Sequence, residues 1–330
     1  MTIKYINTYI NEAATIAGPY EANGPLKKYY DKTYNKLYFN EKTWEQAEVK
    51  LIKETIKILK NKTKEKEIDL YIGGDLLNQI VASNYAAKEF MTSFIGIYAA
   101  CSTSTLGLIL AANFIESKTT KNVITFTSSH NNSAEKQYRY PVEYGGPKPK
   151  TTTFTSTGAA AAFVSCEKRV IKLESGTIGK VVDSDSKNVF HMGEVMAKAA
   201  ADTIYNHLKD TNRDINYYDL ILTGDLGIYG KKILKEYLKE EYNINLENYN
   251  DTGTMIYDVN KQEVYAGASG PACAPLVTYS YIFNQMKKGK LKKVLLVATG
   301  ALMNPTMVNQ KLTIPAIAHA VSLEAVLWYI

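Results

Sequence analysis

The sequence predicts an α/β protein made of two similar halves, each with a mostly parallel sheet covered by helices. Two apolar segments, residues 69–76 and 219–226, share the pattern D-L-x-x-x-G-D-L and lie 150 positions apart. Each follows a segment with helical periodicity, at 44–59 in the first case and at 195–208 in the second. Helices that alternate with continuous apolar strands are typical of parallel sheets buried on both faces.

Further elements recur in the same order. In the first half, the segment 98–102 (YAACS) leads into a predicted buried helix at 103–115, and an apolar strand follows at 123–127. Matching elements come about 150 to 171 positions later, which indicates an internal duplication. They are the segment 265–269 (YAGAS), a helix at 273–286 and a strand at 294–299.

The two halves meet after the apolar run 159–164, which is typical of a last strand of the first half. We therefore divide the chain into residues 1–172 and 173–330. The two buried helices, one from each half, are expected to lie back to back between two sheets. The fold class predicted is thus an α-β-α-β-α layered α/β fold with two mixed, mostly parallel sheets.

The composition is that of an ordinary globular protein, with 45% hydrophobic and 22% charged residues. The net charge of +6 comes from scattered lysines without a recognisable binding motif, so no nucleic-acid partner is expected. The sequence shows neither a signal-peptide pattern nor an apolar run long enough to cross a membrane. Its three distant cysteines fit neither a disulfide framework nor a metal site, so we expect no metal and a reducing, cytoplasmic compartment.

Cys101 is the strongest candidate for chemistry. It lies where the apolar run 94–100 meets the predicted buried helix, followed by Ser102 and Thr103. Unpaired N–H groups at a helix start favour a thiolate and can hold an oxyanion. The alternative is that Cys101 is a small buried apolar residue, which is common for cysteine.

Polar residues at strand ends are the other candidates. His130 follows the strand 123–127, whose carboxyl end should point to the side of Cys101, and Arg139 belongs to the polar segment after it. Asp75 and Asp225 end the two repeated strands. The alternatives are a surface salt bridge for Arg139 and turn capping for the aspartates.

The two halves resemble those of the thiolase and ketoacyl-synthase superfamily. YAAC at 98–101 resembles the A-x-C nucleophile motif, and TGAAA at 157–161 resembles the D-G-A-G-A strand start. Within that superfamily the chain is similar from end to end to the stage V sporulation protein AD family of spore-forming bacteria. Matching segments are 24–26, 39–47, 128–149, 266–275, 298–305 and 314–324.

This resemblance implies a protein that binds dipicolinic acid (pyridine-2,6-dicarboxylate) and helps to move it into the developing spore. The partners implied are membrane proteins of the same sporulation operon, with the chain held peripherally on the cytoplasmic side of the spore inner membrane. No cofactor is implied; dipicolinate is the ligand, with or without calcium. Superfamily members are commonly dimers through the first-half sheet edge, so a homodimer is a further expectation.

The chain departs from the catalytic pattern of the superfamily. Condensing enzymes support the cysteine with His and Asn, or with two His. One His would follow the strand 220–223, where this chain has Asp225; the Asn or second His would head the second buried helix, where the repeat alignment gives Gly267 and Ala268. The second cysteine of thiolases would fall near Ala298.

We therefore expect a non-catalytic pocket inherited from an enzyme fold, with an acyltransferase or condensing enzyme that uses Cys101 as the alternative. A planar diacid needs charge-assisted donors such as Arg139 or Lys136 and an aromatic wall such as Tyr138 or Tyr140. Asp75 or Asp225 would help if calcium enters with the ligand. The predicted ligand-binding residues are Cys101, Ser102, Thr103, His130, Arg139, Asp75, Asp225 and Gly267.

Overall fold

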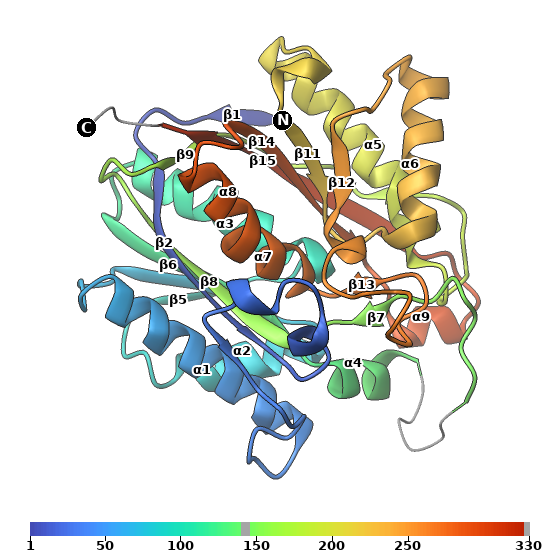
Figure 1. Cartoon of the computed structure of the whole chain (residues 1–330), viewed down its shortest axis with the longest axis horizontal. Coiled ribbons are helices and arrows are strands. Elements are labelled where there is room, and N and C mark those ends of the chain that lie inside the picture. The colour runs from blue at the N-terminus through green and yellow to red at the C-terminus, as the bar shows by residue number, and fades with distance from the viewer. Residues whose placement is uncertain (140–145, 327–330) are drawn as a thin grey trace.

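The computed structural model describes residues 1–139 and 146–326 and confirms the layered α/β fold. Five layers follow one another from the lower left to the upper right of Figure 1. Helices α1 (Trp44–Lys62) and α2 (Val81–Ala87) cover the outer face of the first half, and α5 (Met192–Thr211) and α6 (Gly227–Tyr242) cover that of the second. The buried helices fill the layer between the sheets.

The first-half sheet has the strand order β5-β4-β6-β8-β2. Strand β8 runs antiparallel to both of its neighbours, whereas β5, β4 and β6 are parallel, so four of these five strands point the same way. The bounds are β2 Tyr9–Ala17, β4 Leu70–Gly74, β5 Phe94–Gly96, β6 Asn122–Ser129 and β8 Gly158–Ser165.

The second half repeats this topology as β12-β11-β14-β15-β9, with β15 as the reversed strand. The same order and the same reversal in both halves show the duplication that the sequence predicts. The bounds are β9 Ile171–Thr177, β11 Leu220–Thr223, β12 Tyr249–Asp251, β14 Lys293–Ala301 and β15 Pro315–Ala325.

The two half sheets are hydrogen-bonded to each other. Strand β9 pairs antiparallel with β2 at Ile10↔Ile171, which makes one continuous sheet across the molecule. The boundary predicted between residues 172 and 173 lies inside β9. Short strands complete the pairing: β1 Thr2–Lys4, β3 Lys32–Thr33, β7 Phe154–Thr155, β10 Val182–Asp183 and β13 Ala268–Ser269.

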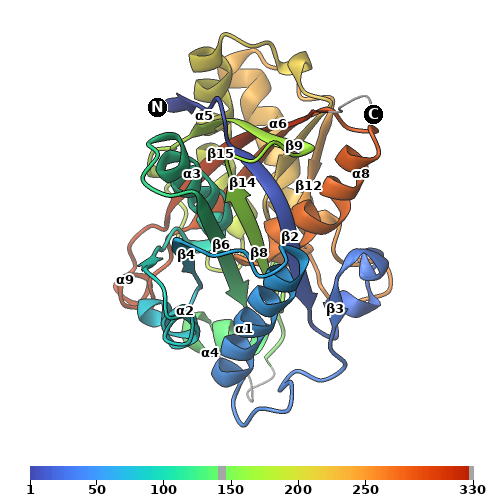
Figure 2. The ribbon, with the colours of Figure 1, turned by 90° about the vertical axis from the view of Figure 1, so that its left-hand side faces the viewer.

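Helix α1 shows how sequence periodicity produces this packing. The side-chain oxygen of Thr43 accepts a hydrogen bond from the backbone N–H of Gln46 and caps the helix start. Ala47, Leu51 and Thr55 recur at helical spacing and are buried. This face packs on β2, β6 and β8, across which α1 lies in Figure 2.

The middle layer is apolar because it touches both sheets. Helix α3 (Thr103–Glu116) contacts β4, β6 and β8 on one side and β14 and β15 on the other, and Leu108 and Ile109 have no exposed surface. Its counterpart consists of α7 (Cys273–Val277), a π-helical turn (Thr278–Ile282) and α8 (Phe283–Lys287). A helix that is apolar on every face is typical of such a position.

Two short helices, α4 (Asn131–Tyr138) and α9 (Pro305–Asn309), follow β6 and β14. Together with the short helical turn Ala100–Ser102 that precedes α3, they surround the carboxyl ends of the central strands. Ligands of open α/β sheets collect at such strand ends.

Candidate functional site

A narrow cavity of about 50 Å³ lies between the two halves at these strand ends. Both halves contribute to its wall, since Tyr98, Cys101 and Tyr138 come from the first and Asp225 and Gly270 from the second. Met192 and Met196 on α5, together with Met303 after β14, form an apolar side.

Cys101 lies in the helical turn Ala100–Ser102 just before α3. Close packing against β14 holds this turn in place: a Cβ at Gly300 would lie 2.4 Å from the carbonyl oxygen of Ala99, so only glycine fits there. The Cys101 side chain lies beside Asp225 and Gly270, which also line the cavity.

Burial, followed by the negative charge of Asp225, raises the pKa of the Cys101 thiol well above its usual value. The sequence predicts the opposite, a thiolate favoured by the helix start. That expectation is wrong because burial and a neighbouring carboxylate outweigh the N–H groups at the end of the helix.

Asp225 lies just after β11 and is buried, with 1% of its surface exposed. Its Oδ1 accepts a hydrogen bond from the Thr299 hydroxyl at 2.7 Å, and its Oδ2 accepts one from the Gly270 N–H at 3.0 Å. Burial nevertheless raises the pKa of this carboxyl to about 7. The site therefore contains a carboxyl group that titrates near neutral pH.

Arg139 lies at the end of α4, and its side chain is only 6% exposed. Its Nη2 forms an ion pair with Glu135 at 2.6 Å, and Lys148 binds the other oxygen of the same carboxylate at 3.0 Å. Within the part of the chain that the structure describes, Nη1 has no hydrogen-bond partner. Arg139 is one of the residues that line the cavity, and a buried guanidinium N–H without a partner is a donor that an anionic ligand can use.

Ser102 and Thr103 do not line the cavity. The Ser102 hydroxyl donates to the Ala298 carbonyl at 3.0 Å and accepts from the His319 N–H, so it joins the turn to the second-half sheet. The Thr103 hydroxyl donates to the Ala100 carbonyl at 2.7 Å. Both side chains stabilise the turn that carries Cys101 instead of contacting a ligand.

His130 does not belong to the cavity either. It is fully buried, its Nε2 lies 2.9 Å from the Leu37 carbonyl, and its Nδ1 accepts a hydrogen bond from the Asn132 N–H at the start of α4. Burial lowers the pKa of His130 to about 4. The carboxyl end of β6 points to the side of Cys101, as predicted, but the imidazole of His130 caps the start of α4.

Asp75 and Gly267 are also structural in their contacts. Asp75 accepts hydrogen bonds from the Leu77 N–H at 2.9 Å and from both the N–H and the hydroxyl of Ser83, so it caps the turn before α2. Gly267 has φ +110°, and its carbonyl accepts from the Phe154 N–H. The alternative of turn capping thus describes Asp75, whereas Asp225 faces the cavity.

The repeat alignment that selects Gly267 is displaced by three residues. Helix α3 starts two residues after Cys101, and α7 starts at Cys273, two residues after Pro271. Pro271 is therefore the counterpart of Cys101, and Ser269 and Gly270 just before it line the cavity.

Other lining residues are less predictable. Tyr138 lines the cavity as a wall, but Tyr140 lies outside the described residues. Lys136 forms an exposed ion pair with Glu45 at 2.9 Å. The methionines on α5 and after β14 carry no sequence signal for a site, because a buried methionine on a helix is usually a core residue.

An outer groove of about 570 Å³ adjoins the cavity and shares Tyr98, Tyr138 and Met303 with it. The hydroxyls of Tyr98 and Tyr138 lie 3.3 Å apart, and the Tyr138 hydroxyl also donates to the Leu76 carbonyl. Because Tyr98 is 44% exposed, a path from solvent leads along the groove to this tyrosine pair.

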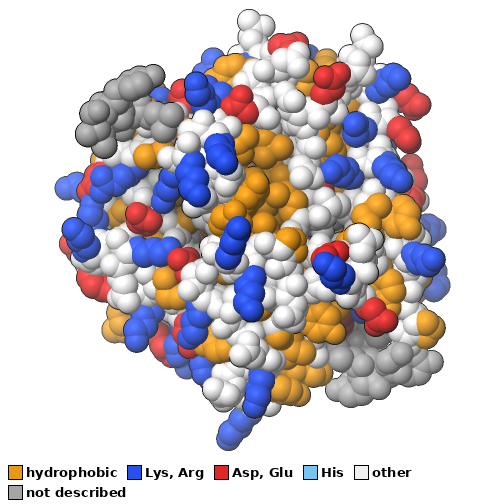
Figure 3. Space-filling model, in the orientation of Figure 1, with side chains coloured by type: hydrophobic (Ala, Val, Ile, Leu, Met, Phe, Trp, Pro, Cys, Tyr) orange, Lys and Arg blue, Asp and Glu red, His pale blue; other side chains and the backbone are white. Residues whose placement is uncertain are grey.

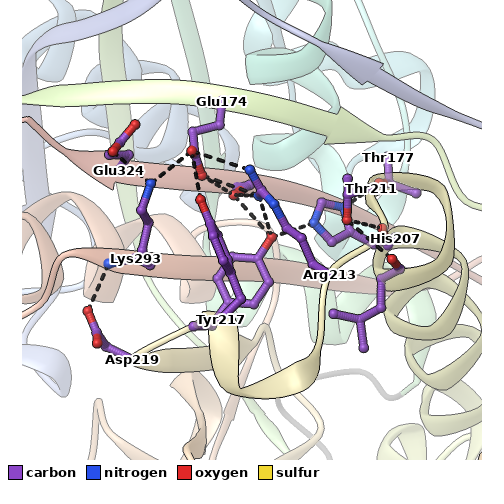
Figure 4. Close-up of polar contacts among 12 residues, drawn as sticks. Glu174, Thr177, His207, Thr211, Arg213, Tyr217, Asp219, Lys293 and Glu324 are labelled. Carbon is purple, nitrogen blue, oxygen red and sulfur yellow. Dashed lines mark hydrogen bonds and ion pairs between the residues drawn. The ribbon is translucent and has the colours of Figure 1, made fainter.

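A second polar cluster lies at the other end of β14. Figure 4 shows Lys293, Arg213 and Tyr217 pointing toward Glu174, with distances of 2.9 Å for Lys293 and 3.1 Å for the Tyr217 hydroxyl. Lys293 is the first residue of β14, whereas Ala301 at the cavity is its last. The Glu174 cluster therefore ties strands together far from the cavity.

The surface has no single basic patch on the face shown in Figure 3, where lysine and arginine side chains are spread around the molecule. Across the described residues, no helix is long and apolar enough to cross a membrane. No group of three or more metal-ligating side chains occurs in this described part.

The chain has a thiolase-like fold. Similar solved structures include 3-oxoacyl-[acyl-carrier-protein] synthase III from Aquifex aeolicus VF5, with TM-score 0.53 and 17% identity over 97% of this chain and 99% of that one. A variant of OleA from Xanthomonas campestris bound with cerulenin gives TM-score 0.62 and 14% identity over 98% of each chain. At these identities the likeness shows the fold alone.

The chain belongs to the stage V sporulation protein AD family, whose family profile matches residues 2–324. It is 47% identical to the stage V sporulation protein AD of Bacillus subtilis strain 168 over 319 residues, which cover 96% of this chain and 94% of that protein. The end-to-end resemblance found in the sequence is thereby confirmed.

Proposed function

We propose that this chain is a non-catalytic dipicolinate-binding protein that acts in dipicolinate uptake into the developing spore. The observation that carries the proposal is Arg139, a cavity-lining residue whose buried guanidinium has, at Nη1, a donor without a partner among the described residues. A buried cationic donor of this kind stabilises a carboxylate through a charge-assisted hydrogen bond.

The remaining wall suits a planar aromatic diacid. Tyr98 and Tyr138 offer hydroxyls and ring surface on one side, and Thr155 and Ser269 offer further hydroxyls. The cavity of about 50 Å³ holds only a few water-sized groups, at about 10–15 Å³ each. A ligand of this size must therefore displace flexible side chains, and the methionines of the apolar side are suited to that.

Isothermal titration calorimetry with dipicolinate tests this proposal. We expect saturable binding tighter than millimolar, and weaker binding of pyridine-2-carboxylate, which lacks the second carboxylate. Runs with and without calcium show whether the ion enters with the ligand, with Asp225 as the carboxyl placed to contact it. No binding of dipicolinate in either condition would sink the proposal.

An acyltransferase or condensing activity that uses Cys101 is the second candidate. It is favoured by the position of Cys101 in the helical turn just before α3. Against it stand the raised pKa of the thiol and a wall that, over the described residues, contains no His, Asn or Lys. Incubation with acyl-CoA followed by intact mass measurement separates the two: an adduct on Cys101 with release of CoA supports the enzyme.

We further propose that the chain acts with membrane proteins of the same sporulation operon, as a peripheral protein on the cytoplasmic side of the spore inner membrane and as a homodimer. Membrane fractionation tests the location, and sedimentation of the purified chain tests the dimer.

A third possibility is a purely architectural subunit, in which case Cys101→Ala should leave dipicolinate accumulation in the spore unchanged. If Cys101 belongs to a ligand site, the same variant should reduce this accumulation.

A further inference from the structure

Two residues in the described wall of the cavity carry a charge, Arg139 on one side and Asp225 on the other. Arg139 shares Glu135 with Lys148, so these three groups together have one positive charge. The Asp225 carboxylate receives hydrogen bonds from two neutral groups in the described structure, the Thr299 hydroxyl and the Gly270 N–H. Among the described residues, no ion pair joins Asp225 to a cation.

The net charge of the cavity wall is therefore close to zero without a ligand. When a dianion binds, the net charge of wall and ligand together becomes strongly negative. Coulomb repulsion between two anions in a water-poor cavity is much larger than the same repulsion in water. A buried carboxyl that meets a second anion reduces this repulsion by binding a proton. Asp225 is placed for this, because it lines the cavity together with Cys101.

On the basis of the proposed function, we propose that Asp225 couples ligand binding to proton uptake, so that the site takes a dicarboxylate together with one proton. The proton comes from the solvent and forms an O–H bond on a carboxylate oxygen of Asp225; no other bond changes. Asp225 is thus a specificity-determining residue, since it opposes any anion that arrives without a compensating positive charge.

The groups that face Asp225 from the neighbouring elements fit this assignment. The thiols of Cys101 and Cys273 stay protonated near neutral pH, since burial raises the pKa of both. The carboxyl of Asp251 also faces Asp225, but it accepts hydrogen bonds from the Leu226 and Gly227 N–H groups at the start of α6. Asp225 is the carboxyl among them that lines the cavity.

The test is calorimetry with dipicolinate in two buffers of different ionisation enthalpy at pH 6 and pH 8. With the pKa of Asp225 at about 7, we expect uptake of about 0.9 proton per ligand at pH 8 and about 0.1 at pH 6. Affinity is then expected to fall about tenfold between pH 6 and pH 8.

Two variants sharpen the result. Asp225→Asn removes the titrating group, so proton uptake should vanish and the affinity should become independent of pH. Asp75→Asn is the matched control, because Asp75 follows the repeated strand of the first half and caps a turn but does not itself line the cavity. If Asp225→Asn does not fold, the buffer comparison on the unaltered chain decides alone.

The outcomes distinguish this inference from the proposed function. Binding with the same heat in both buffers at pH 8 overturns proton uptake and leaves the function standing. Binding that requires calcium and takes up no proton also overturns it, since a cation then compensates Asp225. Absence of binding in every condition refutes the function on which the inference rests.

Discussion

Replacement of Arg139 by glutamine is the most direct test of how this site holds an anion. The change removes the positive charge and keeps a polar side chain of similar length. Hydrogen bonds to charged groups contribute about 1.5–3 kcal/mol each, so the loss of one contact to a carboxylate should weaken dipicolinate binding by about 10- to 150-fold. Titration calorimetry at a pH near 6 measures this change.

The variant also affects stability, because Glu135 loses one of its two partners. The Glu135 side chain is 4% exposed, and removal of one member of a buried pair is usually costly. Lys148 remains on its other oxygen, so we expect a lower free energy of unfolding but a folded protein. Urea denaturation, followed by circular dichroism, measures this part of the effect separately.

Lys148→Gln is the matched control, because Lys148 binds the same carboxylate but does not line the cavity. It should lower stability, and it should weaken dipicolinate binding less than Arg139→Gln does, because it removes one positive charge but no contact to the ligand. Arg139→Lys should be intermediate, since a lysine cannot bind Glu135 and a ligand with the fixed fork of a guanidinium. If Arg139→Gln binds dipicolinate as tightly as the unaltered chain, the assignment of Arg139 as the anion donor is refuted.

Three further predictions concern packing, pH and reactivity. Leu108→Ala leaves a cavity between the two sheets and should lower the free energy of unfolding, measured by urea denaturation, by about 2–5 kcal/mol. Leu110 on the same helix is only partly buried, so Leu110→Ala should lower it less. Equal decreases for the two variants would contradict the layering. Burial, followed by the charge of Asp75, raises the pKa of Glu48 to about 8. The folded state then holds more protons than the unfolded state between about pH 4.5 and pH 8, so the free energy of unfolding should fall as the pH rises through this window. Glu48→Gln should make this fall smaller. Urea denaturation at pH 5 and at pH 8 measures the difference. Iodoacetamide should modify the exposed Cys166 before Cys101. If intact mass spectra of the Cys166→Ser variant still show a rapidly formed adduct, the raised pKa of Cys101 is contradicted.

The sequence predicts much of the fold because local patterns report burial directly. Helix α1 starts at the predicted Trp44, and β6 and β14 enclose the predicted apolar strands. The repeated strand motif reveals the duplication, and both halves have the same strand order. The hydrogen-bonded junction of β9 with β2 has no such signal, since pairing partners that lie far apart in the chain leave no local period.

The candidate site is less predictable than the fold. Cys101, Arg139 and Asp225 are found from the sequence and line one cavity, but His130 and Gly267 do not join them. A polar residue at a strand end either faces the ligand side or caps the next helix, and both roles favour the same residue types. Periodicity therefore cannot separate them.

Asp75 and Asp225 show which features the sequence predicts and which depend on the tertiary structure. Each closes the same D-L-x-x-x-G-D-L strand, so the sequence by itself determined the duplication, the two strands and two carboxyls at their ends. Only the tertiary structure decided that Asp75 binds Ser83 on α2 in its own half, while Asp225 meets Cys101 from the other half. The physical reason is that the environment of a side chain is set by elements distant in sequence, which no local pattern records.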